Sequence, residues 1–247
     1  MFVAASTRCF AEFGFEDACG RITDLEFDKV ELWLDEQSEQ LKPSELAADP
    51  ESFCMKLRET TRLTPIAICL QHDTDLTTFG GLCKLAKLLR IAQITVSGSP
   101  LGTPFNTEID RLRGLLSLAS PDGIRISLKT MTGTLTEDAH TAVELCQSVS
   151  GLGITLDPSY YICGPQGSQP FDQVYPHVFH VHLRDTKPDE LQVQVGLGDI
   201  DYSRMVNQLR RVNYAGSLSV EMIPAMIDVE ARPLEMRKLR MLLETLL

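Results

Sequence analysis

Short runs of apolar residues recur eight times along the chain, and stretches with apolar residues at helical spacing lie between them. Runs of this length, rich in Val, Ile and Leu, are typical of strands buried on both faces. The eight runs span residues 2–6, 29–34, 65–70, 91–96, 123–130, 152–157, 177–183 and 218–222. They predict eight β-strands.

Helical periodicity predicts the connections. We expect helices over residues 43–63, 76–89, 106–119, 136–149, about 201–212 and 229–247, a loop with a short helix over 10–27, and a loop over 158–171. Strands that alternate with helices are typical of parallel sheets. The first run is not followed by Gly-x-Gly-x-x-Gly, and eight units favour a closed (β/α)8 TIM barrel over an open nucleotide-binding sheet. We therefore predict one α/β domain, residues 1–247.

The stretch FHVHLRDTK, residues 179–187, is the most informative. His180 and His182 share one face of the predicted strand because strand side chains alternate. A histidine one step from the end of a buried strand suits a ligand or a proton carrier better than packing. His180, one layer deeper, is expected to be a hydrogen-bonded core residue.

Three further predicted strands also end on an ionisable residue: Lys129, Asp157 and Glu221 join His182 on strands five to eight. In a barrel of this kind the chemistry lies at the carboxyl ends of the strands, and neighbouring strands are about 4.8 Å apart. We expect the four side chains to converge. The residues two positions earlier, expected to form a polar supporting layer, are Ser127, Thr155, His180 and Ser219.

The chain resembles the xylose-isomerase-like barrels, a group that includes isomerases and epimerases of sugars and sugar phosphates and the endonuclease IV enzymes. The resemblance rests on LDPSYY at 156–161, HVHLRD at 180–185, VGLGDIDY at 195–202 and YAGSLSVE at 214–221. It implies a divalent metal (Mn, Mg, Co or Zn) held by four residues, which fall here on Lys129, Asp157, His182 and Glu221. A further family histidine falls on Tyr160.

Two of these positions depart from the family pattern. Lys129 replaces a glutamate, and Tyr160 replaces the histidine. A protonated lysine cannot ligate a metal. We hypothesise that its ammonium, placed between Asp157 and Glu221, takes the charge position of the metal, so that Asp157, His182 and Glu221 no longer hold an ion and no cofactor is required.

Composition narrows the possible partners. The formal net charge of -11 opposes nucleic-acid binding, and seven scattered cysteines without a Cys-x-x-Cys pair indicate neither a zinc knuckle nor a disulfide framework. The N-terminus shows no signal peptide, and no apolar run reaches the roughly 18 to 20 residues of a membrane span. We expect a cytoplasmic protein that binds a small sugar or sugar phosphate. The apolar C-terminal helix could pack on its own barrel or on a second copy.

Three functions stay open from the sequence. The first is a sugar isomerase or epimerase in which Glu221 and Asp157 serve as base and acid, His182 as proton partner and Lys129 as charge stabiliser. The second is a lyase that forms a Schiff base at Lys129. The third is a catalytically degenerate barrel that binds a sugar or a partner. His72, Tyr160 and Arg184 are candidate substrate-binding residues, although each could equally be structural.

Overall fold

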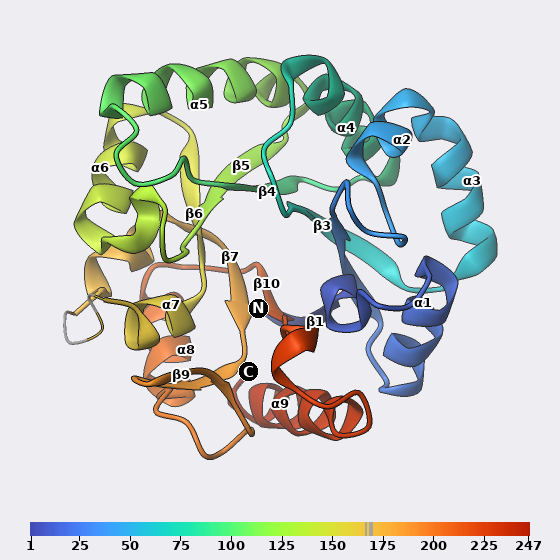
Figure 1. Ribbon diagram of the computed structural model, residues 1–247, viewed down its shortest axis with the longest axis vertical. Coiled ribbons are helices and arrows are strands. Elements are labelled where there is room, and N and C mark those ends of the chain that lie inside the picture. Colours follow the sequence, from blue (N-terminus) through green and yellow to red (C-terminus); the bar gives the residue numbers. More distant parts are fainter. Residues whose placement is uncertain (166, 168–169) are drawn as a thin grey trace.

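The computed structural model describes residues 1–165, 167 and 170–247. A closed barrel of eight parallel strands forms its centre, in the order β1-β10-β7-β6-β5-β4-β3-β2 (Figure 1). The predicted (β/α)8 barrel is confirmed, with strand ends shifted by one or two residues. The strands are β1 (Phe2–Ser6), β2 (Lys29–Leu34), β3 (Thr64–Leu70), β4 (Gln93–Ser97), β5 (Arg125–Lys129), β6 (Leu152–Leu156), β7 (Val178–Leu183) and β10 (Ser217–Val220).

Helices surround the barrel and bury their apolar faces against the strands (Figure 1). In the C-terminal helix, Met236, Leu239 and Leu243 are fully buried on the barrel, whereas Leu234 and Met241 remain exposed. The helices are α1 (Phe15–Asp24), α2 (Pro43–Ala48), α3 (Pro50–Thr60), α4 (Leu76–Leu89), α5 (Phe105–Ala119), α6 (Ala139–Ser148), α7 (Pro158–Cys163), α8 (Tyr202–Arg211) and α9 (Arg232–Leu246). Short 3-10 helices are η1 (Thr7–Phe10), η2 (Ser120–Asp122), η3 (Leu135–Glu137), η4 (Asp172–His177) and η5 (Pro224–Met226).

The helix predicted over residues 43–63 is in fact two helices. Asp49 caps the second helix by accepting the backbone N–H of Ser52 at 3.0 Å, and Pro50 occupies its first position. Proline lacks the N–H that a continuous helix would need at this point, so the chain breaks between α2 and α3.

Two elements were not predicted. The stretch 158–171 is not all loop: residues 158–163 form α7, with Asp157 as its N-cap, while residues 166 and 168–169 lie outside the described part. After β7 the chain forms an antiparallel hairpin of β8 (Asp185–Lys187) and β9 (Glu190–Val193). β8 contains only polar residues and β9 alternates over only four positions, so the hydrophobic pattern is too short to predict the hairpin.

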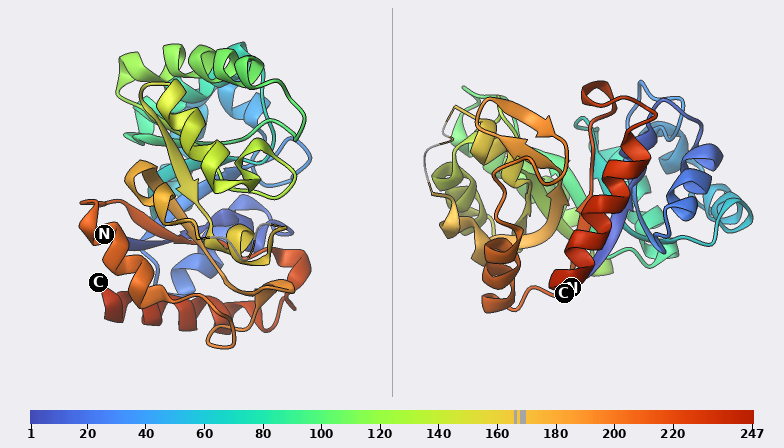
Figure 2. Two further views of the ribbon diagram at one scale, coloured as in Figure 1. Left: turned by 90° about the vertical axis from the view of Figure 1, so that its left-hand side faces the viewer. Right: turned by 90° about the horizontal axis from the view of Figure 1, so that it is seen from below.

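The two ends of the barrel differ in what covers them. In the right-hand view of Figure 2, the β8–β9 hairpin and the segment after β10 stand at one end, and both chain termini lie at the other. The first of these ends is where the strands finish, so it is the end at which barrel chemistry is expected. Among the described residues, none of the helices has the length and apolar character that crossing a bilayer requires.

Close contact between α2 and α4 yields a stability prediction. A Cβ atom at Gly81 would lie 2.5 Å from the backbone oxygen of Ala47, whereas a Cβ atom at Gly80 would meet nothing within 4 Å. We expect Gly81→Ala to lower the free energy of unfolding by about 1–3 kcal/mol, because one helix must move away from the other. Gly80→Ala is the matched control, and it should stabilise the protein by about 0.5–1 kcal/mol. Equal urea midpoints for the two variants would contradict this packing.

Candidate functional site at the barrel mouth

Glu221, which directly follows β10, is the centre of a buried charge cluster. Its Oε1 accepts hydrogen bonds from Lys129 Nζ at 2.7 Å and from Arg8 Nη1 at 2.8 Å. Its Oε2 accepts one from Arg184 Nη2 at 2.6 Å and lies 3.4 Å from His182 Nδ1. Glu221, Arg184 and His182 have no exposed side-chain surface. One carboxylate thus joins four side chains from three separate segments.

Asp157 is held by a different cation. Its Oδ2 forms an ion pair with Arg184 Nη1 at 2.8 Å, and its Oδ1 accepts the backbone N–H of Ser159 at 3.2 Å. The same arginine therefore bridges Asp157 and Glu221. The guanidinium of Arg184 also lies 5.5 Å from the ring of Tyr160, which α7 holds over it. A planar guanidinium suits this double pairing and stacking better than an ammonium would.

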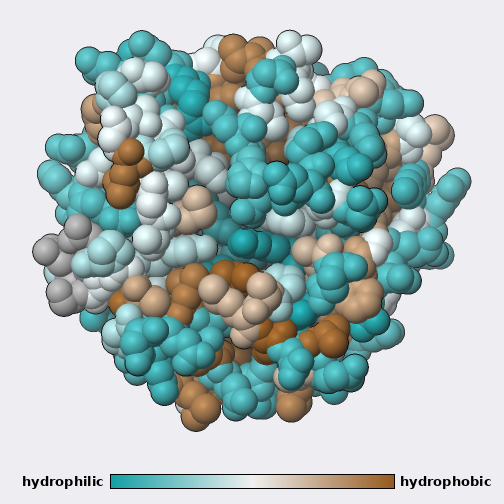
Figure 3. Space-filling view, in the orientation of Figure 1, coloured by the Kyte–Doolittle hydropathy of each residue, from teal (hydrophilic) through white to brown (hydrophobic). Residues whose placement is uncertain are grey.

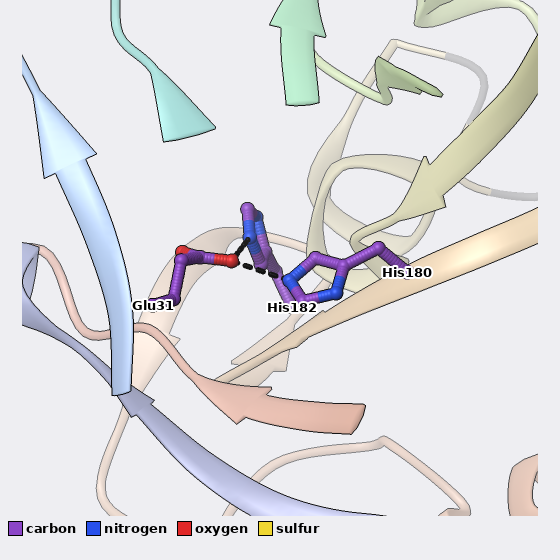
Figure 4. Close-up of side chains that lie close together, drawn as sticks. All are labelled: Glu31, His180 and His182. Atoms are coloured by element: carbon purple, nitrogen blue, oxygen red, sulfur yellow. Dashed lines mark hydrogen bonds and ion pairs between the residues drawn. The ribbon is translucent and has the colours of Figure 1, made fainter. Parts of the chain in front are cut away.

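A second polar layer lies beneath the first (Figure 4). Glu31 of β2 receives both histidines of β7 on its Oε2: His182 Nε2 lies at 2.8 Å, and His180 Nε2 is also hydrogen-bonded. The other ring nitrogen of His180 is 3.1 Å from Ser217 Oγ. The hydrogen bond between His182 Nε2 and Glu31 orients the imidazole ring, and Nδ1 of His182 then faces Glu221. A carboxylate behind a histidine in this way orients the ring.

A layer of hydroxyl and amide side chains lies on β4, β5 and β6. Thr155 Oγ1 is hydrogen-bonded to Thr95 Oγ1 at 2.8 Å and to Ser127 Oγ, and Ser127 also accepts Gln93 Nε2 at 2.6 Å. These side chains fill the barrel on the β4–β5–β6 side, where apolar residues are usual. Ser127 and Thr155 had been expected to line the interior, and they do.

The structure brings the four strand-end residues together, but with a different pairing from the one expected. Lys129 pairs with Glu221, while Asp157 pairs with Arg184. Of the three candidate substrate residues, Tyr160 and Arg184 lie in the cluster. His72 does not: it is exposed and borders a separate hollow of about 290 Å³ between the loops after β2 and β3.

Sequence reasoning missed two members of the cluster and misplaced a third. Glu31 is an acidic residue inside the apolar run KVELWL, and that interruption was a usable signal. Arg8 directly follows the first strand and its Thr7, so the strand-end rule would have found it. The polar letters after Leu183 predict a chain that leaves the core at Arg184. In the structure Arg184, Asp185 and Thr186 are at most 2% exposed, and the last two belong to the β8–β9 hairpin.

Charges dominate the ionisation of this cluster. Burial alone would raise the pKa of Glu221, but the charges of His182, Lys129, Arg8 and Arg184 hold it well below its usual value. Burial likewise opposes the charged form of Lys129, but Glu221 outweighs it and raises the lysine pKa. The pKa of Glu31 is lowered in spite of its burial, because His182 and His180 stabilise its negative charge.

These shifts predict a dependence of stability on pH. Glu31 and Glu221 have folded-state pKa values below the ordinary 4.5, so their stabilisation is complete above that pH and is lost as the pH falls toward the folded values. Each contributes a slope of up to about 1.4 kcal/mol per pH unit in that window. We expect Glu31→Gln to remove one such contribution. Urea unfolding from pH 6 to pH 3 measures it, and identical slopes for the variant and the wild type would refute the assignment.

Whether a divalent metal fits here can be judged from the donors. Two groups bring potential ligand atoms within 4.8 Å of one another: Glu31 with His180 and His182, and Cys69 with His182 and Glu221. Both oxygens of Glu221, however, are engaged by lysine and arginine groups. A divalent ion would lie beside three fixed positive charges in a buried site, where like charges repel strongly. The residues around Glu221 therefore do not fit a divalent ion.

Fold and site together define a (β/α)8 barrel with ionisable residues gathered at the carboxyl ends of its strands. The chain belongs to the xylose isomerase-like TIM barrel family, whose model matches residues 21–243. No curated protein matches the chain by sequence.

Solved structures share the fold at low sequence identity. A D-tagatose 3-epimerase-like protein has a TM-score of 0.76 at 17% identity and covers 100% of this chain and 98% of its own. A probable 3-DHS dehydratase from Bacillus anthracis has 0.72 at 19% identity, with coverage of 97% and 98%. A xylose isomerase-like TIM barrel protein from Mycobacterium smegmatis, in complex with magnesium, has 0.77 at 17% identity, with coverage of 99% and 97%.

Proposed function

We propose that this barrel moves a proton at a carbon next to the carbonyl group of a small sugar or sugar phosphate, as an isomerase or epimerase, and that it does so without a resident divalent metal. The family and its epimerase neighbours support the reaction class. The observation that carries the proposal is the contact of Lys129 Nζ with Glu221, 2.7 Å away, at the end of β5 where the resemblance implies a metal ligand.

Lys129 is the proposed electrostatic stabiliser. Removal of the proton leaves negative charge on the carbonyl oxygen, and a fixed cation in a site shielded from water stabilises it. The raised pKa of Lys129 keeps the ammonium charged at neutral pH. Its Nζ carries three N–H groups, of which one is donated to Glu221, so two remain for a substrate oxygen.

Glu221 and Asp157 are the proposed base and acid. The lowered pKa of Glu221 makes it a weak base, and general bases work best with a pKa near the working pH. His182, whose Nδ1 lies 3.4 Å from Glu221 Oε2, is the proposed proton partner. Glu31 is a positioning residue in this scheme, because it acts by orienting His182.

The Schiff-base lyase gains no support from the geometry. That reaction needs an unprotonated lysine, whereas the pairing with Glu221 raises the pKa of Lys129. The degenerate barrel is the outcome that remains if no chemistry is found.

Exchange of substrate hydrogen with solvent tests the proposal. Ketoses and their phosphates are incubated with the protein in D₂O containing EDTA, and loss of the signal of the hydrogen next to the carbonyl is followed by NMR. We expect exchange with at least one substrate, and a drop of about 10² to 10⁴-fold in Lys129→Met and in His182→Gln. Lys84→Met, at an exposed lysine, is the matched control. If no substrate of the panel exchanges hydrogen with the solvent, the proposal is wrong and the catalytically degenerate barrel is the remaining hypothesis.

A further inference from the structure

The upper layer of the mouth cluster holds more positive charge than the carboxylates of that layer neutralise. This layer contains three fixed cations, Arg8, Lys129 and Arg184, against two carboxylates, Asp157 and Glu221. The third carboxylate, Glu31, lies one layer deeper and is engaged by two histidines. Within this upper layer, three positive charges against two negative charges leave one positive charge over. In a chain of net charge -11, this excess is a local feature of the mouth.

Hydrogen bonding shows the same imbalance. Both oxygens of Glu221 and both oxygens of Asp157 already face donors. In the described part of the chain, by contrast, the Arg8 side chain donates through Nη1 alone, although a guanidinium has five N–H groups. Arg8 therefore offers unused N–H donors and positive charge to a ligand at the mouth.

Arg8 is the cation that a ligand can reach. Its side chain is 13% exposed, compared with 4% for Lys129 and 0% for Arg184. The guanidinium lies 5.9 Å from the ring of Trp33, whose Nε1 donates to Gln71 at 3.1 Å, so an anchored aromatic group flanks it. Figure 3 shows hydrophilic side chains in a depression at the centre of the face viewed in Figure 1.

We propose that the mouth selects a substrate that carries a single carboxylate, a sugar acid rather than a neutral sugar, and that Arg8 binds this carboxylate. The assignment rests on the proposed function for its placement in the same site. A guanidinium binds a carboxylate through two parallel N–H groups, which gives orientation as well as charge. One negative charge balances the excess of one, whereas a phosphate dianion would leave a surplus negative charge among buried groups.

Two probes with the same six-carbon polyhydroxyl skeleton isolate the carboxylate. Calorimetry at low salt compares D-gluconate with D-sorbitol, and D-sorbitol 6-phosphate tests the other kind of anion. We expect gluconate to bind at least 10-fold more tightly than either of the other two. Equal affinity for gluconate and sorbitol overturns the inference, and so does tighter binding of the phosphate.

Variants of Arg8 test its role. Arg8→Gln should lower gluconate affinity to the sorbitol level, and Arg8→Lys should restore part of it, because the charge returns without the paired N–H groups. Arg113→Gln is the control, at an arginine that is 62% exposed on α5. Unchanged gluconate affinity in Arg8→Gln, with a far-ultraviolet circular dichroism spectrum like that of the wild type, overturns the assignment. Affinity lost from Arg8→Gln but partly kept in Arg8→Lys supports it even if both are less stable.

The two proposals can fail separately. Gluconate that binds through Arg8, with no hydrogen exchange in any carbonyl substrate tested, supports the carboxylate site and removes the proposed reaction. Hydrogen exchange in neutral ketoses, with gluconate binding no more tightly than sorbitol, supports the proposed reaction and removes the carboxylate site.

Discussion

Replacing Glu221 with glutamine should destabilise the protein by about 3–5 kcal/mol, the range found when one partner of a buried ion pair is removed. The substitution keeps the shape of the side chain but leaves Arg8, Lys129 and Arg184 buried against Asp157 alone. For a chain of this size the thermal midpoint should fall by roughly 6–20 °C. Urea unfolding followed by circular dichroism gives the free energy, and a differential scan gives the midpoint.

Glu51→Gln is the matched control. Glu51 pairs with Lys84 on the surface, where both side chains are more than half exposed, and such pairs contribute about 0–1 kcal/mol. A loss at Glu221 as small as the loss at Glu51 would mean that the cluster does not act as a network, and the proposed arrangement of charges at the mouth would then be wrong.

Metal binding should appear only when the cation is replaced. We expect the wild type to bind Mn²⁺ weakly, with a dissociation constant in the millimolar range or above, because the ammonium of Lys129 holds Glu221. Lys129→Glu combined with Tyr160→His changes the local charge by two units and adds an oxygen and a nitrogen donor. The affinity should rise about 10³-fold, a change of about 4 kcal/mol. Calorimetric titration with Mn²⁺, Zn²⁺ and Co²⁺ measures it.

Lys129→Met separates the two parts of that change. It removes the cation without adding a ligand, so its affinity should rise above that of the wild type but stay well below that of the double variant. A stoichiometric micromolar site in the wild type would overturn the metal-independent proposal. Hydrogen exchange that is gained only by the metal-loaded double variant would identify the natural protein as a degenerate barrel.

The barrel could be predicted because strands and helices leave different periodic patterns. Eight apolar runs and the helical spacing between them fixed the element order, and eight alternating units close into a barrel. Periodicity failed where local chemistry decides. Asp49 and Pro50 break a helix whose apolar spacing continues through them. In the β8–β9 hairpin, β8 has no apolar residue and β9 alternates over only four positions, which is too short a pattern to predict a strand.

The site was predictable only in part. Lys129, Asp157, His182 and Glu221 were found because each lies where a strand ends, and that position follows from the chain alone. Glu31 was not found, because its contacts with His180 and His182 join residues about 150 positions apart in the sequence. Arg8 meets Glu221 across a still longer separation. Contacts of this kind form only when β1, β2 and β7 close around one axis, so one-dimensional patterns do not contain them.

The barrel and the four ionisable residues at its strand ends follow from the sequence alone, because each depends on spacing along the chain. The extent of the single domain stays a prediction. Tertiary structure alone decided which charge meets which. Arg184 pairs with Asp157 and Glu221, and Lys129 pairs with Glu221. Glu31 contacts His180 and His182. The physical reason is that Coulomb and hydrogen-bond energies depend on distances of a few ångströms in a buried medium, and barrel closure sets those distances.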